Sequence, residues 1–225
     1  MSNTKNMSIW DQVKKTDPKY TKESRFGRKV TSISPQYQIQ EATRVFGPYG
    51  KGWGFSSCEL DMSHLDTISL VLVKAVFFYV IDGERHEFSI NNSWPIKVIK
   101  KKGQEPSPDE DFAKKAETNT MSKALSRLGF SADIFMGQFD DHEYVAMVNN
   151  EIALDNAEDK IEEARKQQDE YEEKCAKELK FIKSSASLNE LQKLFTDFVR
   201  RANLHQDKNQ ILALTKAKDA RKSEL

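Results

Sequence analysis

One long, largely apolar segment constrains the fold more than any other feature of this 225-residue sequence. It spans residues 67–81 and consists mostly of β-branched and aromatic side chains, which are typical of a strand. Asp82 and Gly83 follow it and match a two-residue hairpin turn, and residues 85–90 alternate polar and apolar like a return strand. With one more strand expected over residues 55–61, the sequence predicts an antiparallel meander.

Helices are expected on both sides of this meander along the sequence. Ser34 and Pro35 suit the cap and the first position of a helix that ends before Gly47. A second helix is expected over residues 108–128, and residues 174–225 hold two or three further amphipathic segments. The predicted fold class is therefore α+β, with an antiparallel β-meander packed on helices and a C-terminal helical module.

Aromatic residues and charges are distributed unevenly along the chain. Of the 22 aromatic residues, 18 lie in residues 1–150, so the main core is expected there. The formal net charge is zero, but residues 1–51 carry +6, residues 151–173 carry −7 and residues 174–222 carry +7. The predicted organisation is a basic arm over residues 1–33, a core over 34–150, an acidic helical connector over 151–173 and a small helical module over 174–225.

Several classes of protein are not expected from this sequence. No window approaches the roughly 20 consecutive apolar residues that a membrane helix needs, and residues 1–17 lack the apolar segment of a signal peptide. Cys58 and Cys175 are far apart, and the four histidines lack metal-ligand spacing. No phosphate-binding loop motif occurs. We therefore expect no cofactor and no catalytic constellation.

Two acidic clusters are candidate metal sites. One comprises residues 140–143, and the other flanks the predicted hairpin over residues 82–87. A metal-dependent nuclease would need carboxylates that converge from different elements, such as Asp140, Asp141 and Glu87. We favour the structural interpretation, in which the first cluster caps a helix and the second is a solvated turn.

Basic residues gather around the predicted helix over residues 108–128. Lys115, Asn119, Lys123 and Arg127 are spaced four apart and form one polar stripe, as a solvated helix surface also would. A glycine-rich loop over residues 48–54 adds a lysine and two aromatic residues. Lysines could neutralise a nucleic-acid backbone while exposed aromatic side chains stack on bases. The predicted DNA-binding residues are Lys51, Lys97, Lys100, Lys101, Lys102, Lys115, Lys123 and Arg127.

Three segments, in this order, resemble the single-strand annealing proteins of the Rad-fifty-two-like superfamily, especially the short phage-encoded ones. The first is residues 41–47 running on to Gly-Trp-Gly-Phe at 52–55, and the second is the strand 68–81 with its turn and His86-Glu87. The third is the helix over residues 116–129, followed by the run 139–144. The opening, residues 9–20, is also similar to phage members. The resemblance covers about residues 8–148.

The resemblance implies a β-β-β-α core that assembles into a homo-oligomeric ring or filament. Single-stranded DNA would lie in a basic groove, where complementary strands are annealed without ATP, cofactor or enzymatic step during phage homologous recombination in the host cytoplasm. A Lys-Arg pair on the family's DNA-contacting helix corresponds to Ser122 and Lys123 here, and Arg127 lies one turn later. A basic residue early in the first helix falls near Tyr37 or Gln38.

The C-terminal module lies outside the segments that carry the resemblance. In related phage proteins such a module docks a partner exonuclease or the host single-strand binding protein. Here Lys193, Arg200 and Arg201, on the helix expected over residues 187–203, are the candidates to receive an acidic peptide. A solvated bundle surface or an oligomer contact is the alternative. For the whole chain, the alternative function is protective single-strand binding without annealing.

Overall fold

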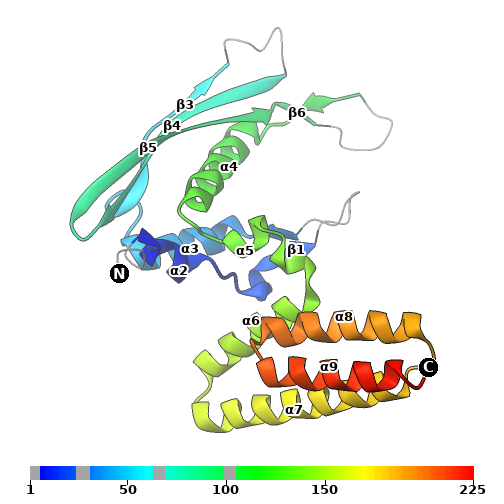
Figure 1. Ribbon diagram of the computed structural model, residues 1–225. Helices are drawn as coiled ribbons and strands as arrows, with labels where there is room; N and C mark the ends of the chain where they lie inside the picture. Colours follow the sequence, from blue (N-terminus) through cyan, green and yellow to red (C-terminus); the bar gives the residue numbers. More distant parts are fainter. Residues whose placement is uncertain (1–5, 24–30, 63–68, 99–104) are drawn as a thin grey trace. The chain divides into compact units, whose positions relative to one another are not determined.

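The computed structural model describes residues 6–23, 31–62, 69–98 and 105–225, and the chain divides into two compact units (Figure 1). Unit 1 is Met1–Asp140 and unit 2 is Asp141–Leu225. The sequence placed the end of the core near residue 150. The structure divides the chain earlier, because the helix that starts at His142 packs with the C-terminal helices.

The α+β fold class is confirmed, and the meander is the centre of unit 1. Strands β3 (Trp53–Asp61), β4 (Leu70–Ile81) and β5 (Glu84–Pro95) pair antiparallel in the order β3-β4-β5. Asp82 and Gly83 connect β4 to β5 with φ of 52° and 81°, the positive values that a two-residue hairpin of this kind requires. Strand β5 continues past the predicted end at residue 90, so Asn92 and Trp94 also lie on the sheet.

Helix α4 (Phe112–Arg127) covers one face of this sheet (Figure 1). Alternate residues of β4, from Val71 to Phe77, are buried beneath it, as the two-residue period of a strand requires. The helix contributes buried Ala116, Thr120, Ala124 and Leu125 to this contact. It begins at Phe112 rather than at residue 108, because Ser107–Pro108 forms strand β7 and pairs with β6 (Lys97–Val98).

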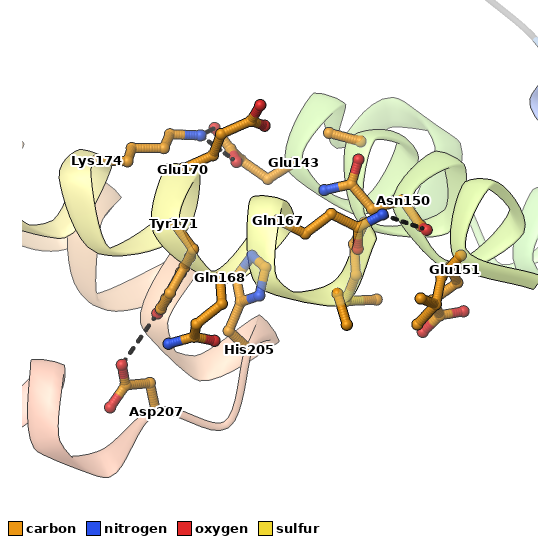
Figure 2. A pocket seen from close by; sticks show the side chains of 14 residues that line it. Glu143, Asn150, Glu151, Gln167, Gln168, Glu170, Tyr171, Lys174, His205 and Asp207 are labelled. Atoms are coloured by element: carbon orange, nitrogen blue, oxygen red, sulfur yellow. Dashed lines mark hydrogen bonds and ion pairs between the residues drawn. The ribbon is translucent and has the colours of Figure 1, made fainter. Parts of the chain in front are cut away.

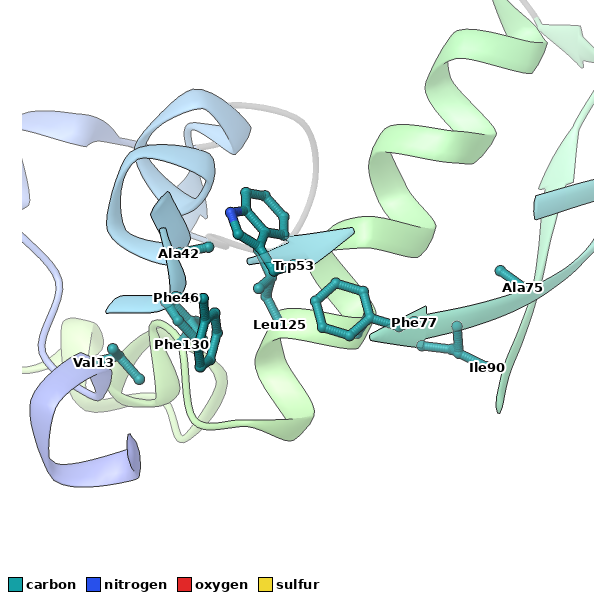
Figure 3. Close-up of a cluster of buried hydrophobic side chains, with 10 residues drawn as sticks. Val13, Ala42, Phe46, Trp53, Ala75, Phe77, Ile90, Leu125 and Phe130 are labelled. Atoms are coloured by element: carbon teal, nitrogen blue, oxygen red, sulfur yellow. The ribbon is translucent and has the colours of Figure 1, made fainter. Parts of the chain in front are cut away.

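Helix α3 (Pro35–Phe46) begins and ends where the sequence predicts. Figure 3 shows its buried Ala42 and Phe46 in the same core cluster as Phe77 and Leu125. The following turn returns so tightly that a Cβ on Gly52 would lie 1.8 Å from the Phe46 carbonyl oxygen, so only glycine fits there. Trp53 follows at once and is 0% exposed, which corrects the expectation that it is an exposed aromatic of the loop.

The N-terminal arm, predicted as a basic segment, contains α2 (Ser8–Val13), the 3-10 helix η1 (Pro18–Tyr20) and the antiparallel pair of β1 (Thr21–Glu23) and β2 (Thr31–Ile33). Val13 belongs to the main core cluster. The short helix α5 (Ala132–Phe135) comes after α4 in the chain, and η2 (Gln138–Asp140) follows it. The arm is therefore part of the folded unit.

Unit 2 consists of α6 (His142–Asn156), α7 (Lys160–Ser184), α8 (Leu188–Leu204) and α9 (Lys208–Lys222). Its core is formed by Ile182, Leu191, Leu214 and Ala217. Ser187 caps α8, because its hydroxyl accepts from the amide of Glu190. In the part of the chain that the structure describes, none of the helices is both long enough and apolar enough to cross a membrane.

Candidate nucleic-acid interface

A groove of about 540 Å³ follows the exposed face of α4 in unit 1. Its other walls come from the end of β2, the start of α3, strand β5 and α5. The residues that α4 contributes are Lys114, Lys115, Thr118, Asn119, Ser122 and Lys123. The opposite walls include Ile33, Pro35, Trp94 and Phe135.

The lining residues share one helix face because they recur three and four residues apart. The buried residues of α4, such as Ala116 and Ala124, lie on another face and pack on the sheet. From Asp111 to Lys123 this face extends over about 18 Å at 1.5 Å per residue. The groove is therefore long enough for a short stretch of an extended chain.

Lys123 lies at the border between α4 and β5. Its Nζ donates to the Oδ1 of Asn92 at 2.7 Å, and the Nδ2 of Asn92 donates to Asn119 Oδ1 at 2.9 Å and Thr120 Oγ1 at 3.1 Å. Asn92 is a neutral acceptor, so this hydrogen bond does not pair the Lys123 ammonium with a carboxylate. Among the residues that the structure describes, this is the one bond of the Lys123 ammonium, so two of its three N–H groups are left for a ligand. This predicted DNA-binding residue is positioned for contact with an anion in the groove.

Lys115 lines the same groove but is already paired. Its Nζ contacts both carboxylate oxygens of Asp109 at 2.7 and 2.8 Å, and the Asp109 side chain is buried. A charge that neutralises a buried carboxylate contributes little to the potential of the groove. Lys115 therefore acts mainly in holding the segment before α4.

Lys114 is the cation that sequence reasoning missed. It lies one position away from the stripe that contains Lys115 and Lys123, and it is exposed in the groove. Within the described residues, neither Lys114 nor Lys123 forms an ion pair with a carboxylate. The signal in the sequence was the second row of the same face, in which Lys114, Thr118 and Ser122 are spaced four apart.

Three other predicted DNA-binding residues do not line the groove, namely Arg127, Lys51 and Lys97. Arg127 donates to the Ser89 carbonyl oxygen at 3.2 Å, and its guanidinium lies 5.9 Å from the Phe88 ring centroid, at the border with β5. Lys51 is exposed in the turn before β3, and Lys97 is exposed on β6. Lys100, Lys101 and Lys102 lie outside the described residues.

Two aromatic side chains that the sequence analysis did not single out also line the groove. Trp94 lies on β5 and packs, partly buried, against the cluster of Val71, Val73 and Ala116. Phe135 ends α5 and is 59% exposed. The sequence does not show whether one aromatic residue in a short apolar segment is exposed. The exposure of its side chain depends on which other parts of the chain pack against it.

Asp141 and Glu87, both considered as metal ligands, form hydrogen bonds and ion pairs with nearby protein groups. Asp141 accepts from the amide of Glu143 at 3.0 Å as the cap of α6, and it also pairs with Arg200. Glu87 lies on β5, where it accepts from Ser56 at 3.3 Å. Among the residues that the structure describes, no group of three or more His, Cys, Asp or Glu side chains could hold a metal ion.

The three residues predicted to receive an acidic peptide differ in their surroundings. Arg201 is only 11% exposed and pairs with Glu178 and, at 3.6 Å, with Glu143. Arg200 pairs with Asp141, so both arginines contact carboxylates of their own unit. Lys193 is exposed and has no carboxylate partner in the described part of the chain. The three do not form a basic surface that is open to a peptide.

Unit 2 contains a separate cavity of about 670 Å³ between α6, α7 and the segment before α9 (Figure 2). The hydroxyl of Tyr171 donates to Asp207 at 3.2 Å. The ring centroids of Tyr171 and His205 lie 4.5 Å apart. Burial raises the pKa of Tyr171 well above its usual value and lowers the pKa of His205.

The charges around this cavity disfavour nucleic acid. Its acids are Glu143, Glu151, Glu170 and Asp207, whereas Lys174 is its one lysine and contacts Glu143 at 2.9 Å. A phosphate would meet mainly carboxylates there. The α4 groove is therefore the better candidate for a nucleic-acid ligand.

No protein-family model matches the chain, and a search of curated protein sequences found no match.

Proposed function

We propose that this protein binds single-stranded DNA along α4 and anneals complementary strands without ATP, in phage homologous recombination in the cytoplasm of a bacterial host. The observation that carries the proposal is a groove in which Lys114 and Lys123 lie beside the aromatic walls Trp94 and Phe135. Among the described residues, neither lysine is paired with a carboxylate. The groove combines the two chemistries of non-specific single-strand binding, namely cations for phosphates and aromatic rings for bases.

The physical mechanism needs no covalent chemistry. Lysine contacts to phosphates carry no sequence information, so any strand is held with its bases available for pairing. Neutralising the phosphates reduces the repulsion between two strands. Pairing then releases about 1.4 kcal/mol per base-pair step, so no nucleotide hydrolysis is required.

Annealing of longer strands would require several copies of the chain. The lining face of α4 is about 18 Å long, which corresponds to at most about five nucleotides, the number reached at the 3.4 Å spacing of a strand in duplex DNA. Copies placed side by side in a ring or filament would extend the groove. We therefore include a homo-oligomer in the proposal, and light scattering with and without DNA measures it directly.

The test is a fluorescence-quench assay with two complementary oligonucleotides, without ATP, run with and without magnesium. Pairing faster than the spontaneous rate, with intact DNA, supports annealing. The double variant Lys114→Glu/Lys123→Glu should lose this acceleration, whereas Lys180→Glu/Lys216→Glu, two exposed lysines of unit 2, should keep it. Equal loss in both pairs would contradict the assignment of the groove.

Protective single-strand binding is the second candidate, and the same groove supports it. A protein that only protects should bind single strands tightly but slow their pairing, because its aromatic side chains compete with the complementary strand for the bases. The sign of the rate change in the annealing assay therefore separates the two functions. Cleavage of the DNA with magnesium would instead favour a nuclease.

A further inference from the structure

Phe135 is a large apolar side chain that the fold keeps exposed. It is 59% exposed at the end of α5, and the neighbouring Met136 is 66% exposed. Single exposed apolar residues are common and need no explanation. Phe135 differs because it lines a groove whose other wall carries Lys114 and Lys123.

The segment that carries Phe135 is rigidly supported. Ser131 donates its amide to the Val13 carbonyl oxygen at 3.0 Å, and Asp133 donates its amide to the Lys14 carbonyl oxygen at 3.1 Å. The carboxylate of Asp133 is buried and accepts two further bonds from Thr16. These hydrogen bonds connect α5 to the N-terminal arm and so hold in place the backbone that carries Phe135.

The side chains that line the groove favour a nucleobase as the group that packs on the exposed Phe135 ring. Between the two lysines, α4 presents the neutral hydrogen-bonding side chains of Thr118, Asn119 and Ser122. A strand whose phosphates contact the lysines would place its bases within the same groove. An aromatic ring that stacks on a base contributes a factor of about five to 150 in affinity, whichever base it is.

We infer that Phe135 stacks on an unpaired base of the bound strand, so the groove recognises bases as well as phosphates. The inference rests on the proposed single-strand binding and specifies its ligand as DNA with accessible bases. A duplex offers no free base face to a side chain at this position. Trp94, partly buried on β5, forms the second aromatic wall.

The experiment compares an oligothymidylate with an abasic oligomer of the same length and charge, by fluorescence anisotropy at one salt concentration. The wild-type chain should bind the oligothymidylate more tightly by a factor between about five and 150. Phe135→Ala should reduce this ratio at least fivefold by weakening oligothymidylate binding alone, whereas Phe135→Tyr should keep it. Phe181→Ala is the matched control, because Phe181 is 56% exposed on α7 in unit 2.

Three results would overturn the inference, and each leads to a different conclusion. Equal binding of both oligomers by the wild-type chain would leave single-strand binding intact and remove stacking. A change of oligomeric state in Phe135→Ala with an unaltered ratio would assign the exposed ring to a protein contact. Binding of neither oligomer would contradict the proposed function itself. Thermal melting of each variant shows that the fold is kept. If the alanine variant is unstable, Phe135→Leu tests stacking, because it keeps an apolar side chain without an aromatic ring and should also reduce the ratio.

Discussion

The backbone amide and the hydroxyl of Thr16 both donate to the carboxylate of Asp133, each at 2.7 Å, although 117 residues separate them in the sequence. Both residues are buried. The contact joins the N-terminal arm to α5, and α5 carries one wall of the groove along α4. The arm therefore supports the candidate site without lining this part of it.

Loss of the Asp133 carboxylate should destabilise unit 1. Asp133→Ala leaves the buried amide and hydroxyl of Thr16 without an acceptor, which costs about 1–3 kcal/mol for each buried unsatisfied group. Urea denaturation measures the change in the free energy of unfolding. Asp140→Ala is the control, because Asp140 is exposed at the end of η2 and its loss should change stability by about 0.5 kcal/mol or less. Equal effects in the two variants would contradict a structural role for the Thr16–Asp133 contact.

Lys114 and Lys115 are adjacent but should respond differently to substitution. Lys114→Ala should weaken single-strand binding and reduce the salt dependence of the binding constant by about 0.7 in log–log slope, as for one lost phosphate contact. Lys115→Ala should instead lower stability, because it removes the ion pair between Lys115 and the buried Asp109 carboxylate. Anisotropy titrations at several salt concentrations, combined with denaturation of both variants, provide the comparison. If the two variants behave alike, the ion pair with Asp109 does not distinguish the two lysines.

The parts of the fold that the sequence predicts are those with local causes. The β4–β5 hairpin follows from Asp82-Gly83 and the neighbouring alternation, and the start of α3 follows from Ser34-Pro35. Local signals mislead where a distant segment competes. Ser107-Pro108 would suit the start of a helix, but Lys97 pairs with Pro108 in the β6–β7 ladder, so α4 begins later.

The candidate site is only partly predictable for the same reason. The four-residue spacing in α4 placed Lys115 and Lys123 on one face, and the structure brings both to the groove. Spacing could not show that Lys115 is paired with Asp109, six residues earlier, while Lys123 has a neutral partner on β5. Nor could it show that Phe135 is exposed, because the position of α5 depends on contacts with the N-terminal arm.

Arg201 and Lys193 should differ sharply in their effect on unit 2. Arg201→Met removes the partner of Glu178, whose side chain is 5% exposed and also accepts from Gln210 at 3.1 Å. Breaking a buried ion pair by removal of one member costs about 3–5 kcal/mol. Lys193→Met is the matched control, since it removes an exposed charge and should change stability by about 0.5 kcal/mol or less. Chemical denaturation measures both, and equal stabilities would contradict a structural role for Arg201.

His205 predicts a pH dependence that originates in unit 2. Burial lowers the pKa of His205 in the folded chain below its ordinary value of 6.5, and the positive charges of Lys174 and Arg201 also lower it. The carboxylates of Glu143 and Asp207 oppose this shift. The unfolded chain therefore binds a proton near pH 6.5, whereas the folded chain resists binding until the pH is lower.

The free energy of unfolding should therefore fall as the pH decreases through 6.5 towards the folded pKa, and His205 should contribute no slope well above pH 7. His205→Asn removes this part of the dependence, so the variant should lose less stability than the wild-type chain between pH 7.5 and about 5.5. Denaturation midpoints at a series of pH values measure the difference. His142→Asn, a substitution of an exposed histidine on α6, is the matched control and should follow the wild-type curve. Parallel curves for the wild-type chain and His205→Asn would show that burial does not hold the imidazole of His205 neutral, and the acid sensitivity of unit 2 would then have to come from its carboxylates.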